Sequence, residues 1–271
     1  MYYLEPFEPK ILVQYFRDQT YLKNLIHPLC ILGVPDLSNL GEISTKYLIK
    51  ELNAEKILTY HISDFLPIGY VENQEGTFKL SYLDLYLIKD FQNSRDFIII
   101  TGNEAPLSPI GNHFVANMIA DLLGSYNSEL FISIASNPTS YSSLTPQLYF
   151  VSNFNELLQM FKLDEKTHQN KELSLQLLQK GLIAGVNALS VSYASTFYNI
   201  PSGILLSEVL ESVEFDYTAV KAILKVLDAV LKLQLSFKAL DLDAKKFQKN
   251  YPKEPLSENE ALKNVRRRIQ T

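Results

Sequence analysis

One stretch, LCILGVPDLSNLGEISTKYLIKEL at residues 29–52, restricts the fold more than any other part of the chain. It begins with a short apolar run, residues 29–34, that is typical of a strand covered on both faces. A turn rich in Gly, Pro, Asn and Ser follows, and apolar residues then recur at helical spacing from Ile43 to Leu52. A second apolar run, residues 57–62, comes directly afterwards. This order predicts a βαβ unit in an open α/β sheet.

The turn in this stretch also predicts how the helix begins. Asn39, followed three residues later by Glu42, fits a variant N-terminal capping pair. The loop from Gly33 to Gly41 precedes a helix N-terminus, where backbone N–H groups can bind an anion. It lacks both the phosphate-loop pattern and the close glycine spacing of a dinucleotide site. A tight packed turn is therefore favoured over ligand binding, and both interpretations remain open.

The rest of the chain alternates in the same way between apolar runs and amphipathic segments. Residues 10–16 fit either a strand or a helical turn, and 78–82 fit the edge of a hairpin. A capping box at Ser257 predicts a last helix with Leu262, Val265 and Ile269 on one face. The other predicted elements are strands at 97–100, 130–135, 147–151 and 203–208, and helices at 112–123, 155–161, 186–198, 218–233 and 237–248.

Four segments in this order resemble the proteasome assembly chaperone family. In the first, GVPDLSNLGEISTKYLIKELNAEKI, the matches include Gly33, Pro35, Gly41 and Tyr47, while Ser38 stands where a glycine is usual. The other three are FIIITGNEAPLS, GLIAGVNALSVSYASTFYNIPSGILLSE and FDYTAVKAILKVLDAVL. The resemblance implies a three-layer α/β/α fold like that of nucleoside phosphorylases, with added C-terminal helices. We accordingly expect an α/β core at residues 1–235 and a helical extension at 236–271.

The resemblance also implies a function, that of an interaction protein. It implies a chaperone-like, homo-oligomeric factor that binds proteasome α-subunits or another protein partner through an apolar patch with a polar rim. Family members that dock on the proteasome ring often end in a hydrophobic residue, a tyrosine and one further residue. This chain ends Ile269-Gln270-Thr271. Docking through a tail of that type is therefore not expected, whereas binding through another surface is.

Polar residues near predicted strand ends are the candidates for a ligand pocket. In an open parallel sheet, ligands bind at the carboxyl edge of the strands. The same residue types also cap turns and helices, which is the structural alternative. A small-molecule or nucleotide-binding enzyme, related to ATP-dependent ligases, is the second hypothesis for function, although no Lys/Arg pair with clustered acids marks an ATP–magnesium site. The candidate residues are Asp36, Asn39, Gly41, Asn103, Glu104, Asn137 and Glu208.

Composition excludes several other classes. The net charge of −5 gives no basic field for nucleic acid or anionic lipid, and Arg266–Arg268 form the one basic cluster. The single cysteine, Cys30, lies in an apolar run and fits a reducing, cytoplasmic setting. The four histidines are scattered, so we expect no metal and no cofactor. Residues 181–207 lack charge but contain many polar side chains, so we expect no membrane insertion.

Overall fold

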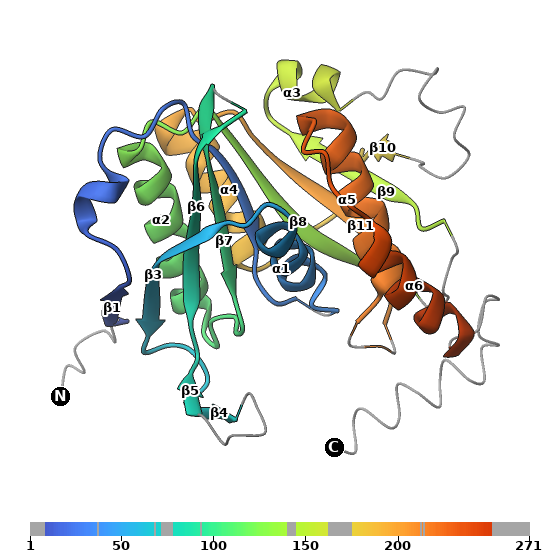
Figure 1. The fold of residues 1–271 in the computed structure, drawn as a ribbon, viewed down its shortest axis with the longest axis horizontal. Coiled ribbons are helices and arrows are strands. Elements are labelled where there is room, and N and C mark those ends of the chain that lie inside the picture. The colour runs from blue at the N-terminus through green and yellow to red at the C-terminus, as the bar shows by residue number, and fades with distance from the viewer. Residues whose placement is uncertain are drawn as a thin grey trace, which may run out of the picture.

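A computed structural model describes residues 9–36, 38–67, 69–71, 78–92, 94–139, 145–161, 175–211, 213 and 215–250. Within these residues, nine strands form one sheet that is covered by helices on both faces (Figure 1). The order across the sheet is β1-β3-β6-β7-β2-β8-β11-β9-β10. The strands are β1 (Ile11–Tyr15), β2 (Leu29–Gly33), β3 (Glu55–Ile62), β6 (Leu83–Phe91), β7 (Arg95–Gly102), β8 (Leu130–Thr139), β9 (Leu148–Ser152), β10 (Leu175–Leu177) and β11 (Ser202–Leu210).

Four parallel strands form the centre of this sheet. β7, β2, β8 and β11 are neighbours that run in the same direction, so their carboxyl ends meet at one edge. Antiparallel pairs continue the sheet on both sides, through β6, β3 and β1 on one side and through β9 on the other. A separate two-stranded hairpin, β4 (Gly69–Val71) with β5 (Phe78–Leu80), confirms the predicted hairpin edge.

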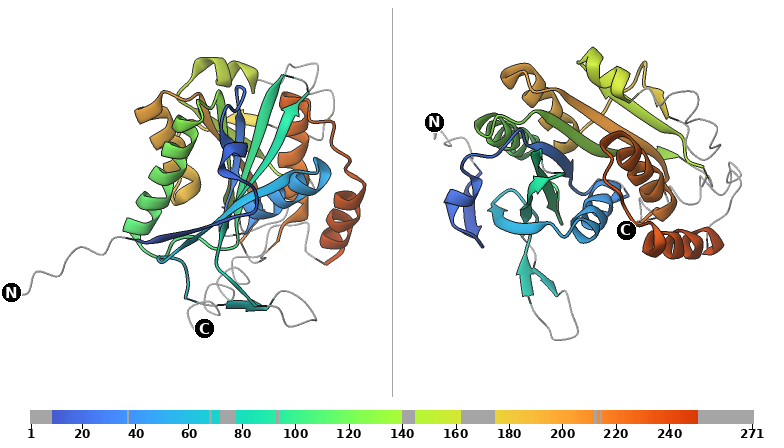
Figure 2. Two further views of the ribbon diagram at one scale, coloured as in Figure 1. Left: turned by 60° about the vertical axis from the view of Figure 1, so that its left-hand side comes forward. Right: turned by 45° about the horizontal axis from the view of Figure 1, so that its top comes forward.

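The two faces of the sheet carry separate hydrophobic cores. Because neighbouring strand residues point to opposite faces, Ile31 and Leu32 are both fully buried but belong to different cores. Figure 2 shows the helices in two layers on opposite sides of the sheet. α2 (Pro109–Ser125) and α4 (Val186–Tyr198) cover one face, while α1 (Leu40–Glu51), α3 (Asn155–Met160) and α5 (Tyr217–Leu231) cover the other.

The predicted fold class is confirmed, because a large sheet lies between two helix layers. The open choice at residues 10–16 is resolved as strand β1. Cys30 is fully buried, as expected for a small hydrophobic residue.

Among the helices of the described ranges, none is both long enough and apolar enough to cross a membrane. The predicted last helix after Ser257 and the arginines at 266–268 lie outside the described residues.

The α6 helix (Lys238–Asn250) packs back onto the core. Leu240, Ala244 and Phe247 are buried, and Asp243 accepts a hydrogen bond of 2.5 Å from the hydroxyl of Tyr47 on α1. Lys221 of α5 also forms an ion pair with Asp241, with 2.7 Å between Nζ and Oδ1. The first part of the C-terminal segment is thus held against both α1 and α5.

The end of β2 and the start of α1 approach each other so closely that neither backbone has room for a side chain. A Cβ atom added to Gly33 would lie 2.2 Å from the carbonyl oxygen of Gly41. A Cβ atom on Gly41 would lie 3.0 Å from Cα of Gly33. The buried hydroxyl of Thr45 lies 3.0 Å from the Gly41 carbonyl oxygen and 2.8 Å from the hydroxyl of Thr101 on β7. These contacts fix α1 over the ends of two central strands.

Replacing Gly33 with alanine is expected to lower the free energy of unfolding by about 3 kcal/mol, because the new methyl group collides with backbone that cannot rotate away. Gly181→Ala is the matched control, since its Cβ meets only the side chain of Leu178, at 3.3 Å. The control should change stability by less than about 0.5 kcal/mol. Urea unfolding followed by circular dichroism measures both, and equal stability of the two variants would contradict the close approach.

Candidate functional site

A large pocket opens at the carboxyl edge of the parallel strands. Its volume is about 1100 Å³. The ends of β8 and β11, the loop after β7, the start of α1 and the segment 178–187 that leads into α4 form its walls. This is where ligands bind in open α/β sheets, and it is the place to which the polar candidate residues were assigned.

The structure brings five of the seven candidate residues together in this pocket and leaves two outside it. Gly41 does not line it, because its backbone is packed against Gly33. Glu208 does not line it either, and its carboxylate accepts a 3.3 Å hydrogen bond from the hydroxyl of Tyr149. The five that line the pocket are Asp36, Asn39, Asn103, Glu104 and Asn137.

Two of the candidates lie at positions that differ from the expected ones. Asn137 and Glu208 were expected just beyond strand ends, but they lie within β8 and β11 and are paired with each other in the ladder. The reason is that these two strands continue to pair to Thr139 and Leu210, beyond the end of their apolar runs. Backbone pairing therefore extends the strands to the rim of the sheet, where Asn137 lines the pocket and Glu208 does not.

Asp36 ties the loop before α1 to the end of β8. One oxygen of its carboxylate accepts a 2.7 Å hydrogen bond from the backbone N–H of Ser136, and the other accepts from the N–H groups of Ser38 and Leu40. Burial raises the pKa of the Asp36 carboxyl, and these hydrogen bonds oppose that shift. Asp36 therefore has a structural role at the pocket wall.

The expected capping pair of Asn39 and Glu42 is wrong. Asn39 adopts a left-handed backbone with a φ of 51°, and its side chain makes no capping hydrogen bond. Asp36 bonds the N–H of the first helical residue instead, and Glu42 pairs with Lys46 at 2.5 Å between Nζ and Oε1. The side-chain amide of Asn39 therefore does not cap α1, and it lines the pocket instead.

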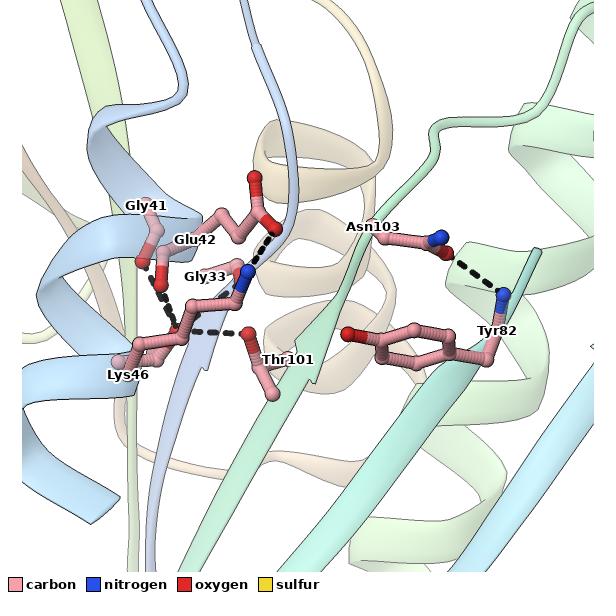
Figure 3. A network of polar contacts seen from close by, with 8 residues as sticks. Gly33, Gly41, Glu42, Lys46, Tyr82, Thr101 and Asn103 are labelled. Carbon is pink, nitrogen blue, oxygen red and sulfur yellow. Dashed lines mark hydrogen bonds and ion pairs between the residues drawn. The ribbon is translucent and has the colours of Figure 1, made fainter. Parts of the chain in front are cut away.

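Asn103 links the ends of β6 and β7 at the pocket wall. Its Oδ1 accepts a 2.7 Å hydrogen bond from the backbone N–H of Tyr82, and its own N–H donates to the Tyr82 carbonyl. Figure 3 shows these two residues beside Glu42, Lys46 and Thr101. The amide group is fixed through its oxygen, so its Nδ2 is a rigidly placed donor.

Charges of both signs surround the pocket. Lys46 and Lys180 line it, as do the carboxylates of Asp36, Glu42 and Glu104. Burial raises the pKa of Glu104, and the negative charge of Glu42 adds to this shift. Because acids and lysines are mixed, the described part of the pocket lining does not concentrate positive charge of the kind that binds phosphate groups.

Asn187 is a pocket residue that the sequence reasoning missed. Its buried side chain accepts from the backbone N–H of Val34 at 3.3 Å and donates to the Val34 carbonyl at 3.2 Å. It thereby joins the start of α4 to the residue that follows β2. A signal was available, because Asn187 is a polar residue in an uncharged segment that packs as a buried helix.

Within the described ranges, no group of three His, Cys, Asp or Glu side chains is arranged to hold a metal ion. His113 does not line the pocket, and its Nδ1 lies 2.9 Å from the hydroxyl of Tyr193 in an exposed contact. Among the described residues that line the pocket are amides, carboxylates and lysines, and none of them is a histidine or a cysteine. The amides, carboxylates and lysines can bind a partner through hydrogen bonds.

Residues 30–253 match the PAC2 family, which accounts for most of the chain. The chain belongs to this family. The predicted resemblance to proteasome assembly chaperones is thereby confirmed. A curated relative, an uncharacterised protein of Methanocaldococcus jannaschii, is 24% identical over 257 residues, which cover 95% of this chain and 93% of the relative.

Solved structures of PAC2-type proteins share the fold of this family member. PbaB of Pyrococcus furiosus, an archaeal proteasome activator, superposes with a TM-score of 0.75 at 22% identity, over 89% of this chain and 96% of PbaB. PbaA of Pyrococcus furiosus, an archaeal homolog of proteasome-assembly chaperone, gives a TM-score of 0.68 at 21% identity, over 95% and 96% of the two chains. At these identities the likeness shows the fold alone.

Replacing Asn187 with alanine is expected to lower the free energy of unfolding by about 2–4 kcal/mol, because both backbone groups of Val34 lose their buried partner. Asn117→Ala is the control, because that asparagine is exposed on α2 and contacts Asp121 one turn away. The control should remain within about 0.5 kcal/mol of wild type. Chemical unfolding compares the two, and a neutral Asn187→Ala would show that water replaces the lost bonds.

Proposed function

We propose that this PAC2 family member is a cytoplasmic, homo-oligomeric interaction protein that binds proteasome α-subunits. The observation that carries the proposal is the presence of exposed apolar side chains on the segments that contribute to the pocket. Leu182 and Phe215 both line the pocket, and Leu182 is fully exposed. Leu107 and Ile110 are exposed just before and in the first turn of α2, the helix that contributes Asn112 to the pocket.

Such an arrangement has the features of a protein-binding surface. Exposed apolar side chains that gather around a concave centre mark interaction sites, and polar groups at the rim add specificity. Lys46, Lys180 and Glu104 supply that polar surround. The names of the two Pyrococcus furiosus structures associate those proteins with the proteasome, which makes its α-subunits the first partner to test.

Leu182→Ser is expected to weaken binding of α-subunits roughly tenfold, or about 1.4 kcal/mol, because a central exposed anchor loses its apolar contact. Leu242→Ser is the matched control, since Leu242 is also exposed but lies on α6 and does not line the pocket. Surface plasmon resonance with purified α-subunits from the same host measures both variants. Absence of binding by the wild-type protein would overturn the proteasome partner, and equal binding by both variants would overturn the surface.

A second candidate function, binding of a small molecule or nucleotide, is favoured by the volume of the pocket. About 1100 Å³ is large enough for a ligand of nucleotide size. Isothermal titration with ATP and Mg²⁺ tests this candidate, with Lys46→Ala as the variant that removes a lysine from the wall. Under the interaction proposal no saturable heat is expected. Magnesium-dependent binding that Lys46→Ala weakens would instead support the enzyme hypothesis.

A further inference from the structure

The outer edge of β1 has no backbone hydrogen-bonding partner among the described residues. β1 is the end strand of the sheet and, among the described residues, pairs with β3 alone. The carbonyl of Lys10 accepts from the N–H of Ser63, just after β3, and the N–H of Phe16 donates to the carbonyl of Ile57 in β3. The backbone groups of the even-numbered residues between them therefore also face β3. The N–H and carbonyl groups of Ile11, Val13 and Tyr15 therefore point outward, away from the sheet.

The side chains of this edge strand are apolar and exposed to solvent. Leu12 is 70% exposed, and Val13, Tyr15 and Phe16 are between 40% and 45% exposed. Edge strands are normally protected by charged residues, proline or a bulge. The sequence ILVQYF contains no charge and no proline, and its register with β3 is continuous. An apolar edge of this kind is suited to pairing with another strand.

We propose that β1 pairs antiparallel with β1 of a second copy of this chain, about a two-fold axis at Gln14. In this register Leu12 lies opposite Phe16 of the second copy, and Val13 lies opposite its Tyr15. Each exposed apolar side chain thus gains an apolar partner, and the outward groups of Val13 and Tyr15 bond each other. Lys10, an exposed cation, comes opposite the exposed Asp18 of the second copy, which makes the edge complementary in charge to itself.

The side-chain pairs that each register forms distinguish this register from the nearest alternative. Backbone bonding also permits an axis at Val13, because that register joins the same outward-facing residues. It would place Leu12 opposite Gln14 and Lys10 opposite Phe16, so that apolar and polar groups face each other. The axis at Gln14 instead pairs the two amides with each other. It is favoured because Leu12 then meets Phe16, Val13 meets Tyr15 and Lys10 meets Asp18, while Ile11 meets Arg17.

This inference deepens the proposed function, since it rests on the self-association proposed there. It does not depend on the identity of the partner that binds at the pocket. Each proposal can therefore be refuted without the other. Native mass and cross-linking test self-association through β1, while binding of α-subunits tests the surface at the pocket.

Oxidative cross-linking of Gln14→Cys tests the register directly. Residues opposite each other at a non-hydrogen-bonded position have Cα atoms about 4.5 Å apart, within the range that a disulfide spans. The native Cys30 is fully buried and does not compete. We expect most Gln14→Cys chains to form a covalent dimer. Leu12→Cys is the matched control on the same face, because two copies of residue 12 would lie about 13 Å apart.

Val13→Pro tests the backbone contribution without relying on a new cysteine. Proline removes the outward N–H of Val13. The hydrogen bonds to β3 are retained, because the even-numbered residues on either side of Val13 make them. The dissociation constant of the dimer, measured by analytical ultracentrifugation, should rise at least roughly tenfold. Circular dichroism at low concentration should show an unchanged fold. A monomeric wild-type protein, or an oligomer in which Gln14→Cys does not cross-link, would overturn the proposal.

Discussion

The close approach of β2 and α1 is the constraint on which the rest of the structure depends. With 2.2 Å between a hypothetical Cβ of Gly33 and the Gly41 carbonyl, only glycine allows the helix to begin directly over the strand it follows. That contact places Thr45 against Thr101 and so aligns the ends of β2 and β7. The pocket lies at this edge, so its shape follows in part from two glycines that are not among its lining residues.

Three polar side chains of the pocket wall satisfy backbone groups of other segments. Asp36 bonds three N–H groups from two segments, Asn103 holds the N–H of Tyr82, and Asn187 holds both groups of Val34. Buried backbone groups without partners are costly, so these polar residues are required by the fold whether or not a ligand binds. This is why polar residues at a sheet edge are weak evidence for catalysis, and why the exposed apolar side chains nearby carry more weight for function.

The sequence alone predicted most elements, because each is marked by a local apolar pattern. The limits of α4, Val186–Tyr198, were predicted correctly, and the strand at residues 97–100 was recognised from an unbroken apolar run. The direction in which β6 and β9 pair was not predictable, since it depends on contacts between residues far apart in the chain. The roles of Asp36 and Asn187 were hidden for the same reason, as their partners Ser136 and Val34 lie 100 and 153 residues away.

The order of strands separates the two surfaces that are open to partners. β1 is at the end of the sheet, and three strands, β3, β6 and β7, lie between it and β2. The pocket instead collects residues from the ends of β8 and β11 and from α1, near the middle of the sheet. Pairing of two chains through β1 would extend the sheet sideways and would use none of the residues that line the pocket. The fold therefore allows a self-associated form to present its apolar pocket rims to a second kind of partner, so self-association and partner binding need not compete.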